Sequence, residues 1–91
     1  MDETNFILVR YWAAAKAAAG TAQDELPVNG TVTLADVRRQ AVELHPGTRL
    51  GEVLEACSVL VGDQPVGSRP PDSVLVEPGS SVEFLPPFAG G

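Results

Sequence analysis

The hydrophobic residues of this chain fall in short runs whose spacing predicts alternating strands and helices. Residues 6–12 are nearly all apolar and rich in β-branched and aromatic types, which is typical of a strand covered on at least one face. Residues 13–19 are alanines around Lys16, a composition of very high helix propensity. Gly20 follows where a helix C-cap favours a positive φ. The first strand is therefore expected to lead directly into a short helix.

The clearest element is an amphipathic helix over residues 34–44. Thr33 is a good N-cap, and Asp36 three residues later predicts an acidic variant of the capping box. Apolar side chains recur at helical spacing and share one face, which we expect to pack on a sheet: Leu34, Val37, Ala41 and Leu44. The helix is predicted to end at His45, which precedes Pro46. We interpret His45 as a capping or surface residue.

The remaining pattern predicts short elements and one α+β domain. An edge strand is expected over residues 23–28, because Pro27 lies within it. One or two helical turns are expected at residues 49–56, followed by a strand at 58–61 and a short return at 64–66. A final strand is expected at residues 82–85. We predict a mixed sheet packed on one main helix, with the first and last strands paired at its centre. The domain would span residues 1–85, and residues 86–91 would form a flexible C-terminal tail.

Charge and composition exclude several classes of function. The chain has 91 residues with 12 acidic and 6 basic side chains, a net charge of −6, so it lacks the basic face that nucleic-acid binding requires. A single cysteine, Cys57, excludes an internal disulfide and a cysteine-cluster metal site. The acidic, polar first five residues do not resemble a signal peptide, and no apolar run approaches a membrane span. We expect a cytoplasmic protein that contacts neither membrane nor nucleic acid.

Side chains with catalytic potential are few. His45 is the only histidine and Lys16 the only lysine, and no glycine-rich phosphate loop is present. Cys57 has no basic neighbour in the sequence to lower its pKa, so we interpret it as a buried core thiol. The chain is therefore not expected to be an enzyme on its own, nor to bind a metal or cofactor itself.

The last six residues carry the one distinctive signal. Pro86 and Pro87 stiffen the backbone, whereas Gly90 and Gly91 have no Cβ and can enter a narrow channel. Six extended residues reach roughly 20 Å beyond the folded body. The reactive group would then be the α-carboxylate of Gly91. A frayed end made of small residues is the alternative interpretation.

These features together resemble the MoaD/ThiS family of ubiquitin-like sulfur carriers. The resemblance covers nearly the whole chain and rests on residues 9–13 (VRYWA), 18–20 (AAG), 33–36 (TLAD), 45–46 (HP) and 84–91 (FLPPFAGG). The terminal motif is its most specific part, and the two prolines favour the molybdopterin branch. The family pattern implies a β-grasp fold, in agreement with the predicted element order. Phe88 departs from the pattern, since a smaller aliphatic residue is common there.

The resemblance also implies a mechanism. An E1-like adenylating enzyme of the MoeB type would use ATP and Mg²⁺ to activate the Gly91 carboxylate, and a sulfurtransferase would supply the sulfur of a thiocarboxylate. A molybdopterin synthase large subunit of the MoaE type would then bind the carrier and pass the sulfur to a pterin precursor of the molybdenum cofactor. Gly90 would allow the tail to enter the active site of the partner. The expected partner-binding residues are Phe84, Leu85, Pro86, Pro87, Phe88 and Ala89. Phe84 could instead lie wholly in the core, which strand alternation allows.

Three other functions are compatible with the sequence. The same tail could deliver sulfur for thiamin thiazole or another pathway. A ubiquitin-like modifier would instead form isopeptides through Gly91, although Lys16 alone could not support varied chains of this protein. The last is an interaction module whose diglycine is incidental.

Overall fold

The computed structural model describes residues 5–87. The predicted elements appear in their predicted order, with further short elements between them that the pattern did not predict. Their bounds are β1 (Phe6–Tyr11), α1 (Ala14–Ala19), β2 (Gln23–Pro27), β3 (Val32–Thr33), α2 (Leu34–Leu44), α3 (Leu50–Ala56), β4 (Ser58–Val61), β5 (Gln64–Pro65), the 3₁₀ turn η1 (Pro71–Ser73), β6 (Leu75–Val76) and β7 (Ser81–Leu85). Local signals act as predicted: Thr33 and Asp36 form a reciprocal capping box, and Gly20 caps α1 at φ 77°.

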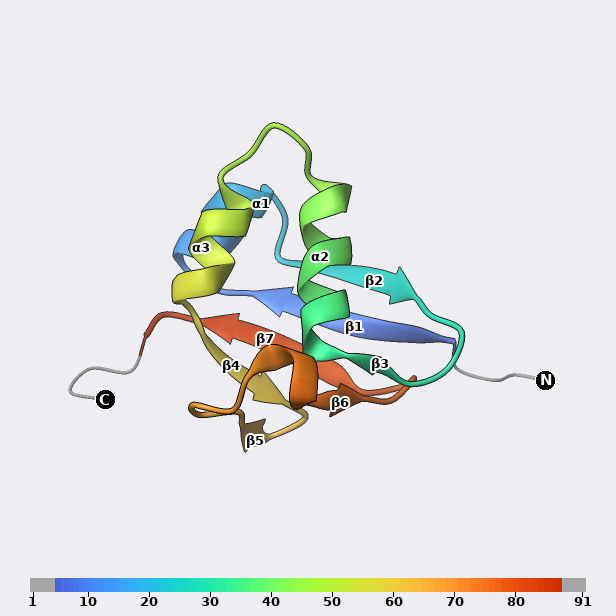
Figure 1. Cartoon of the computed structure of the whole chain (residues 1–91). Helices are drawn as coiled ribbons and strands as arrows, with labels where there is room; N and C mark the ends of the chain where they lie inside the picture. Colours follow the sequence, from blue (N-terminus) through green and yellow to red (C-terminus); the bar gives the residue numbers. More distant parts are fainter. Residues whose placement is uncertain (1–4, 88–91) are drawn as a thin grey trace.

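The strands form a mixed five-stranded sheet in the order β2-β1-β7-β4-β5 (Figure 1). β1 and β7 pair in parallel in its interior, while β2, β4 and β5 pair antiparallel to their neighbours. β3 and β6 make a separate two-stranded ribbon. The predicted mixed sheet, with the first and last strands side by side, is confirmed.

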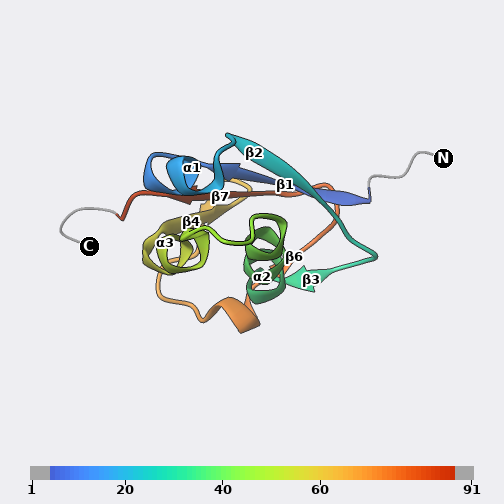
Figure 2. The same cartoon turned by 90° about the horizontal axis from the view of Figure 1, so that it is seen from above.

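The core lies between this sheet and the helices. Figure 2 shows α2 and α3 on the same side of the sheet. From α2, Leu34, Val37 and Ala41 are buried against strand residues that include Ile7 and Val82. The main helix therefore covers the sheet through the face that its spacing predicts, and the α+β class is confirmed.

The prediction that Leu44 completes the buried face of α2 is wrong. Leu44 is 50% exposed, because the helix ends there and the following cap residue turns inward in its place. The His45 side chain is only 16% exposed, and its Nε2 donates to Oδ2 of Asp24 at 2.6 Å. His45 is the C-cap of α2, but it is not a surface residue.

His45 belongs to a polar cluster that ties α2 to the sheet. Oδ2 of Asp24 also accepts a hydrogen bond of 2.8 Å from the Tyr11 hydroxyl. The Tyr11 ring packs edge-on against His45 and stacks on Phe84, with centroids 6.1 and 6.3 Å apart. Tyr11 is 2% exposed, so its hydroxyl needs this partner in order to be buried. The cluster joins β1, β2 and the end of α2.

We expect the ionisation of Tyr11 to be coupled to unfolding. Burial, and then the hydrogen bond and negative charge of Asp24, raise its pKa far above the ordinary value. The neutral phenol is thus favoured in the folded state. Its contribution to stability is complete below the unfolded-state pKa of about 10 and is lost at about 1.4 kcal/mol per pH unit above it.

Alkaline titration of absorbance tests this, because Tyr11 is the only tyrosine. The phenolate signal should appear with the loss of circular dichroism and not before it. The pH dependence of the unfolding free energy of Tyr11→Phe is subtracted from that of the wild type. The difference isolates the contribution of Tyr11 from those of the cysteine and the lysine. A free titration near pH 10 in the folded protein would show that Tyr11 is not buried as described.

Candidate functional site

The C-terminal segment leaves the sheet beside the end of β1. Because β1 and β7 are parallel, their carboxyl ends meet at one edge of the sheet. The Trp12 backbone N–H donates to the Phe84 carbonyl at 3.0 Å, which extends their pairing by one residue. Pro86 and Pro87 follow, both exposed. The predicted residues Phe88, Ala89, Gly90 and Gly91 lie outside the described residues.

Strand alternation divides the predicted docking residues of β7. Val82 and Phe84 are fully buried, so the prediction that Phe84 lies on a docking surface is wrong. Its side chain faces the helices and stacks on Tyr11. Leu85 points to the opposite face and is half-buried. Of the two candidate side chains from this strand, only Leu85 is available to a partner.

Leu85 belongs to a mixed apolar and polar surface on the sheet face turned away from α2 and α3. Directly paired residues share a face, and the register pairs Ser58 with Leu85 and Leu60 with Glu83. Arg10 of β1 pairs with Glu83 from the other side. We call this surface the open face and define it by Leu8, Arg10, Leu60, Glu83 and Leu85.

Trp12 stands at the border of the open face, and sequence reasoning did not single it out. It is 42% exposed, and its Nε1–H donates to Oε1 of Glu83 at 2.9 Å. The Arg10 guanidinium carbon lies 5.4 Å from the centroid of its ring, a cation–π arrangement. A lone tryptophan at a strand end was the available signal, because tryptophan is frequent at protein interfaces.

A hollow of about 370 Å³ opens next to the root of the C-terminal segment. Its walls come from the end of β1, from α1, from α3 and from the two prolines, and they are mainly apolar. We call it the tail-root hollow; its lining is Trp12, Ala13, Ala14, Ala15, Arg49, Glu52, Val53, Ala56, Cys57, Pro86 and Pro87. The site thus combines the open face, the hollow and the start of the tail.

Cys57 lies at the edge of the core, not within it. It is half-buried and packs against the core cluster while also lining the tail-root hollow. Burial raises the pKa of its thiol, which favours the protonated form at neutral pH. The raised pKa agrees with the interpretation of Cys57 as a thiol that is not activated. The prediction that Cys57 is buried in the core is wrong, because the side chain is only half-buried.

Neither metal-binding clusters nor membrane-spanning helices are found within residues 5–87. No group of three or more histidine, cysteine, aspartate or glutamate side chains in this part of the chain is arranged to hold a metal ion. No helix among these residues is long and apolar enough to cross a bilayer.

Sequence comparison relates nearly the whole chain to known proteins. The profile of the ThiS family matches residues 9–91. A protein of Aspergillus niger named molybdopterin synthase sulfur carrier subunit is 26% identical over 91 residues, which is 100% of both chains.

Solved structures share the fold. Small archaeal modifier protein 1 from Methanosarcina acetivorans superposes with a TM-score of 0.73 at 18% identity, over 99% of this chain and 100% of that one. A chain from the complex of subunits 1 and 2 of the molybdopterin-converting factor of Helicobacter pylori gives a TM-score of 0.58 at 22% identity. The match covers 94% of this chain and 99% of that one. These similarities confirm the ubiquitin-like β-grasp fold. The family match over residues 9–91 shows that this chain belongs to the ThiS family, the ubiquitin-like sulfur carriers that include the MoaD proteins.

Proposed function

We propose that this chain is the sulfur-carrier subunit of a molybdopterin synthase. The observation that carries the proposal is the similarity to the Aspergillus niger carrier subunit over all 91 residues, Gly90 and Gly91 included. The reactive group is the Gly91 carboxylate, and the folded domain supplies the surfaces that present it. Catalysis belongs to the partners.

The chemistry follows from the weakness of a carboxylate as an electrophile. An E1-like enzyme with ATP and Mg²⁺ joins a Gly91 carboxylate oxygen to the α-phosphorus and releases pyrophosphate. Sulfide (HS⁻) then attacks the acyl carbon of this mixed anhydride and expels AMP. Where a sulfurtransferase persulfide attacks instead, a second thiol reduces the resulting acyl disulfide and releases the thiocarboxylate. The resulting thiocarboxylate holds sulfur that the synthase large subunit transfers to a pterin precursor.

The division of roles fits the geometry of the tail root. Proline fixes φ and cannot continue a sheet ladder, so Pro86 and Pro87 direct the chain away from β7. Gly90 permits the backbone to enter a narrow channel, while Phe88 and Ala89 would contact its walls. The open face lies beside this exit and offers a surface for the protein that receives the tail.

We expect Leu85→Ala to weaken binding of both the activating enzyme and the large subunit. The side chain lies on the open face, next to the exit of the tail, and truncating one of the few residues that dominate an interface costs more than about 1 kcal/mol of binding. Calorimetric titration measures the effect. Leu75→Ala is the matched control, because Leu75 is 66% exposed on β6, outside the large sheet. Equal affinities for the two variants would remove Leu85 from the docking surface.

A second function has its own supporting observation. The structural similarity to a small archaeal modifier protein favours a modifier whose Gly91 forms isopeptide bonds with lysines. Lys16 is exposed on α1 and would be the single acceptor within this chain. Delivery of sulfur for thiamin thiazole is a third use of the same tail.

One assay separates these functions. Carrier charged as the Gly91 thiocarboxylate is mixed in parallel with molybdopterin synthase large subunit plus pterin precursor and with a thiazole synthase plus its substrates. We expect sulfur loss from Gly91, seen by intact mass, only in the first mixture, together with formation of molybdopterin. Sulfur loss only in the second mixture would assign the chain to thiamin synthesis. Conjugates of higher mass on addition of cell proteins would support the modifier.

A further inference from the structure

We infer that the tail-root hollow is a docking socket for a bulky apolar side chain of the protein that takes up the C-terminal segment. This inference rests on the proposed function and adds to it a second point of attachment, which meets the open face at Trp12. The hollow lies at the root of the tail, has mainly apolar walls and, at about 370 Å³, has room for a bulky side chain.

Its place follows from the parallel pairing of β1 and β7. Pro86 and Pro87, the last described residues before the terminal segment, form part of the wall. A protein that binds the terminal segment is therefore brought close to the hollow, because the segment starts at its wall. The interface that we propose for the tail is continuous with this socket.

The backbone of Ala13, which also lines the hollow, is held in a rare conformation. Ala13 has φ 54° and ψ −120°, and it is the only non-glycine residue with positive φ in the part of the chain that the structure describes. Such a conformation costs about 1–3 kcal/mol and is found preferentially at functional sites. It turns the chain sharply from β1 into α1, so that Trp12 and Ala14 line the same hollow.

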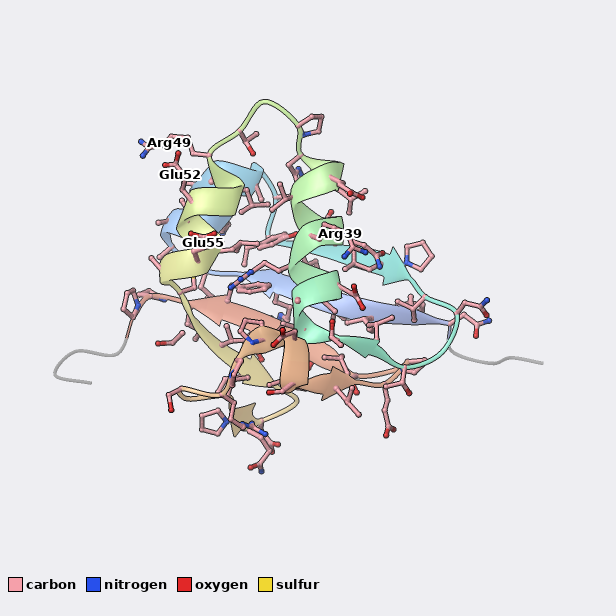
Figure 3. The ribbon with its side chains drawn as sticks, viewed as in Figure 1. Arg39, Arg49, Glu52 and Glu55 are labelled. Atoms are coloured by element: carbon pink, nitrogen blue, oxygen red, sulfur yellow. The ribbon has the colours of Figure 1, made fainter. Side chains whose placement is uncertain are left out.

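The chemistry of the walls favours a side chain over a small polar ligand. Small-molecule sites combine apolar walls with a few convergent polar groups that orient the ligand. Here the charged lining residues Arg49 and Glu52 pair with each other at 3.0 Å and are 82% and 74% exposed. Figure 3 shows them together at the outer end of α3. They form a solvated rim, which leaves Trp12, Val53 and the alanines to contact the occupant.

Trp12 gives the socket an anchor of the type that dominates binding energies. Tryptophan is enriched among interface residues whose truncation costs most. Its indole is oriented by Glu83 at 2.9 Å, so little side-chain freedom would be lost when a partner covers it. The partner that fits presents a leucine, isoleucine or phenylalanine, flanked by polar groups that meet the rim.

A matched pair of variants tests the socket. Ala14 and Ala17 are both exposed residues of α1, but only Ala14 lines the hollow. Ala14→Glu places a carboxylate in the apolar wall, while Ala17→Glu adds the same charge to the same helix elsewhere. Neither changes the core, and equal melting temperatures check this. The probe is the purified large subunit of molybdopterin synthase, titrated calorimetrically into each carrier.

We expect Ala14→Glu to raise Kd about tenfold or more over Ala17→Glu, equivalent to about 1.4 kcal/mol. Equal Kd values for the two variants, with wild-type binding intact, would overturn the socket and leave the proposed function in place. If the wild-type carrier did not bind the large subunit, the proposed function would fail, and the socket with it.

A second measurement distinguishes a partner side chain from the chain's own Phe88. Trp12 is the only tryptophan, so carrier grown with 5-fluorotryptophan gives one ¹⁹F resonance from the socket. We expect this resonance to shift when the large subunit is added and to be unchanged by Phe88→Ala in the free carrier. A shift caused by Phe88→Ala alone would assign the hollow to the chain's own terminal segment and contradict the inference.

Discussion

Val37→Asp is expected to unfold the domain. Val37 is fully buried at the centre of the face by which α2 covers the sheet. A carboxylate there would lie in an apolar core without a partner, at a cost of several kcal/mol. The total stability of small domains is only about 5–15 kcal/mol, with the shortest chains near the lower end. Thermal unfolding followed by circular dichroism should show loss of the cooperative transition.

Leu44→Asp is the matched control for this prediction. It introduces the same group into the same helix, at a position that the hydrophobic pattern also assigns to the core but that is 50% exposed. We expect its melting temperature to stay close to that of the wild type. If Leu44→Asp were as damaging as Val37→Asp, or if both were tolerated, the orientation of α2 would be wrong.

Removal of Gly91 is expected to abolish formation of the thiocarboxylate without affecting the fold. The deletion moves the carboxylate by up to about 3.5 Å along the chain, and misplacement by even about 1 Å can cost on the order of 10²-fold in a reaction that depends on positioning. Gly90→Val should fail as well, because a branched side chain adds bulk and restricts the backbone at the point of entry. Intact mass after incubation with activating enzyme, ATP and a sulfur donor measures the yield.

Gly51→Ala provides a control for substitution of glycine as such. Gly51 lies in α3, and an added Cβ would meet the Val42 methyl groups at 3.7 and 3.8 Å, which is ordinary van der Waals contact. This variant should be charged like the wild type. A Gly91-deleted chain charged at the normal rate would show that the terminus is not the functional group.

Elements fixed by local signals could be predicted from the sequence. The capping box of Thr33 and Asp36 involves residues three positions apart, and the structure contains it as predicted. The apolar run of β1 likewise marks a strand whatever surrounds it. The fold class follows from the order of such elements.

Features that depend on distant partners could not be predicted. His45 turns inward because Asp24, 21 residues away in the chain, accepts its hydrogen bond, and Leu44 is displaced to the surface as a consequence. The alternation of β7 shows two faces but not which one the helices cover, so it allows both a docking role and core burial for Phe84, and only the structure shows that Phe84 is buried. The tail-root hollow needs β1, α1, α3 and the two prolines together, and no sequence window contains them all.

The chemistry of Gly91 tests the central claim most directly. The purified chain is incubated with its E1-like activating enzyme, ATP, Mg²⁺ and a sulfur donor, and the intact mass and the mass of the C-terminal peptide are then measured. The proposal predicts the gain of one oxygen-to-sulfur replacement, located at Gly91 and dependent on ATP. An unchanged mass despite an active enzyme, or a modification located at another residue, would contradict it.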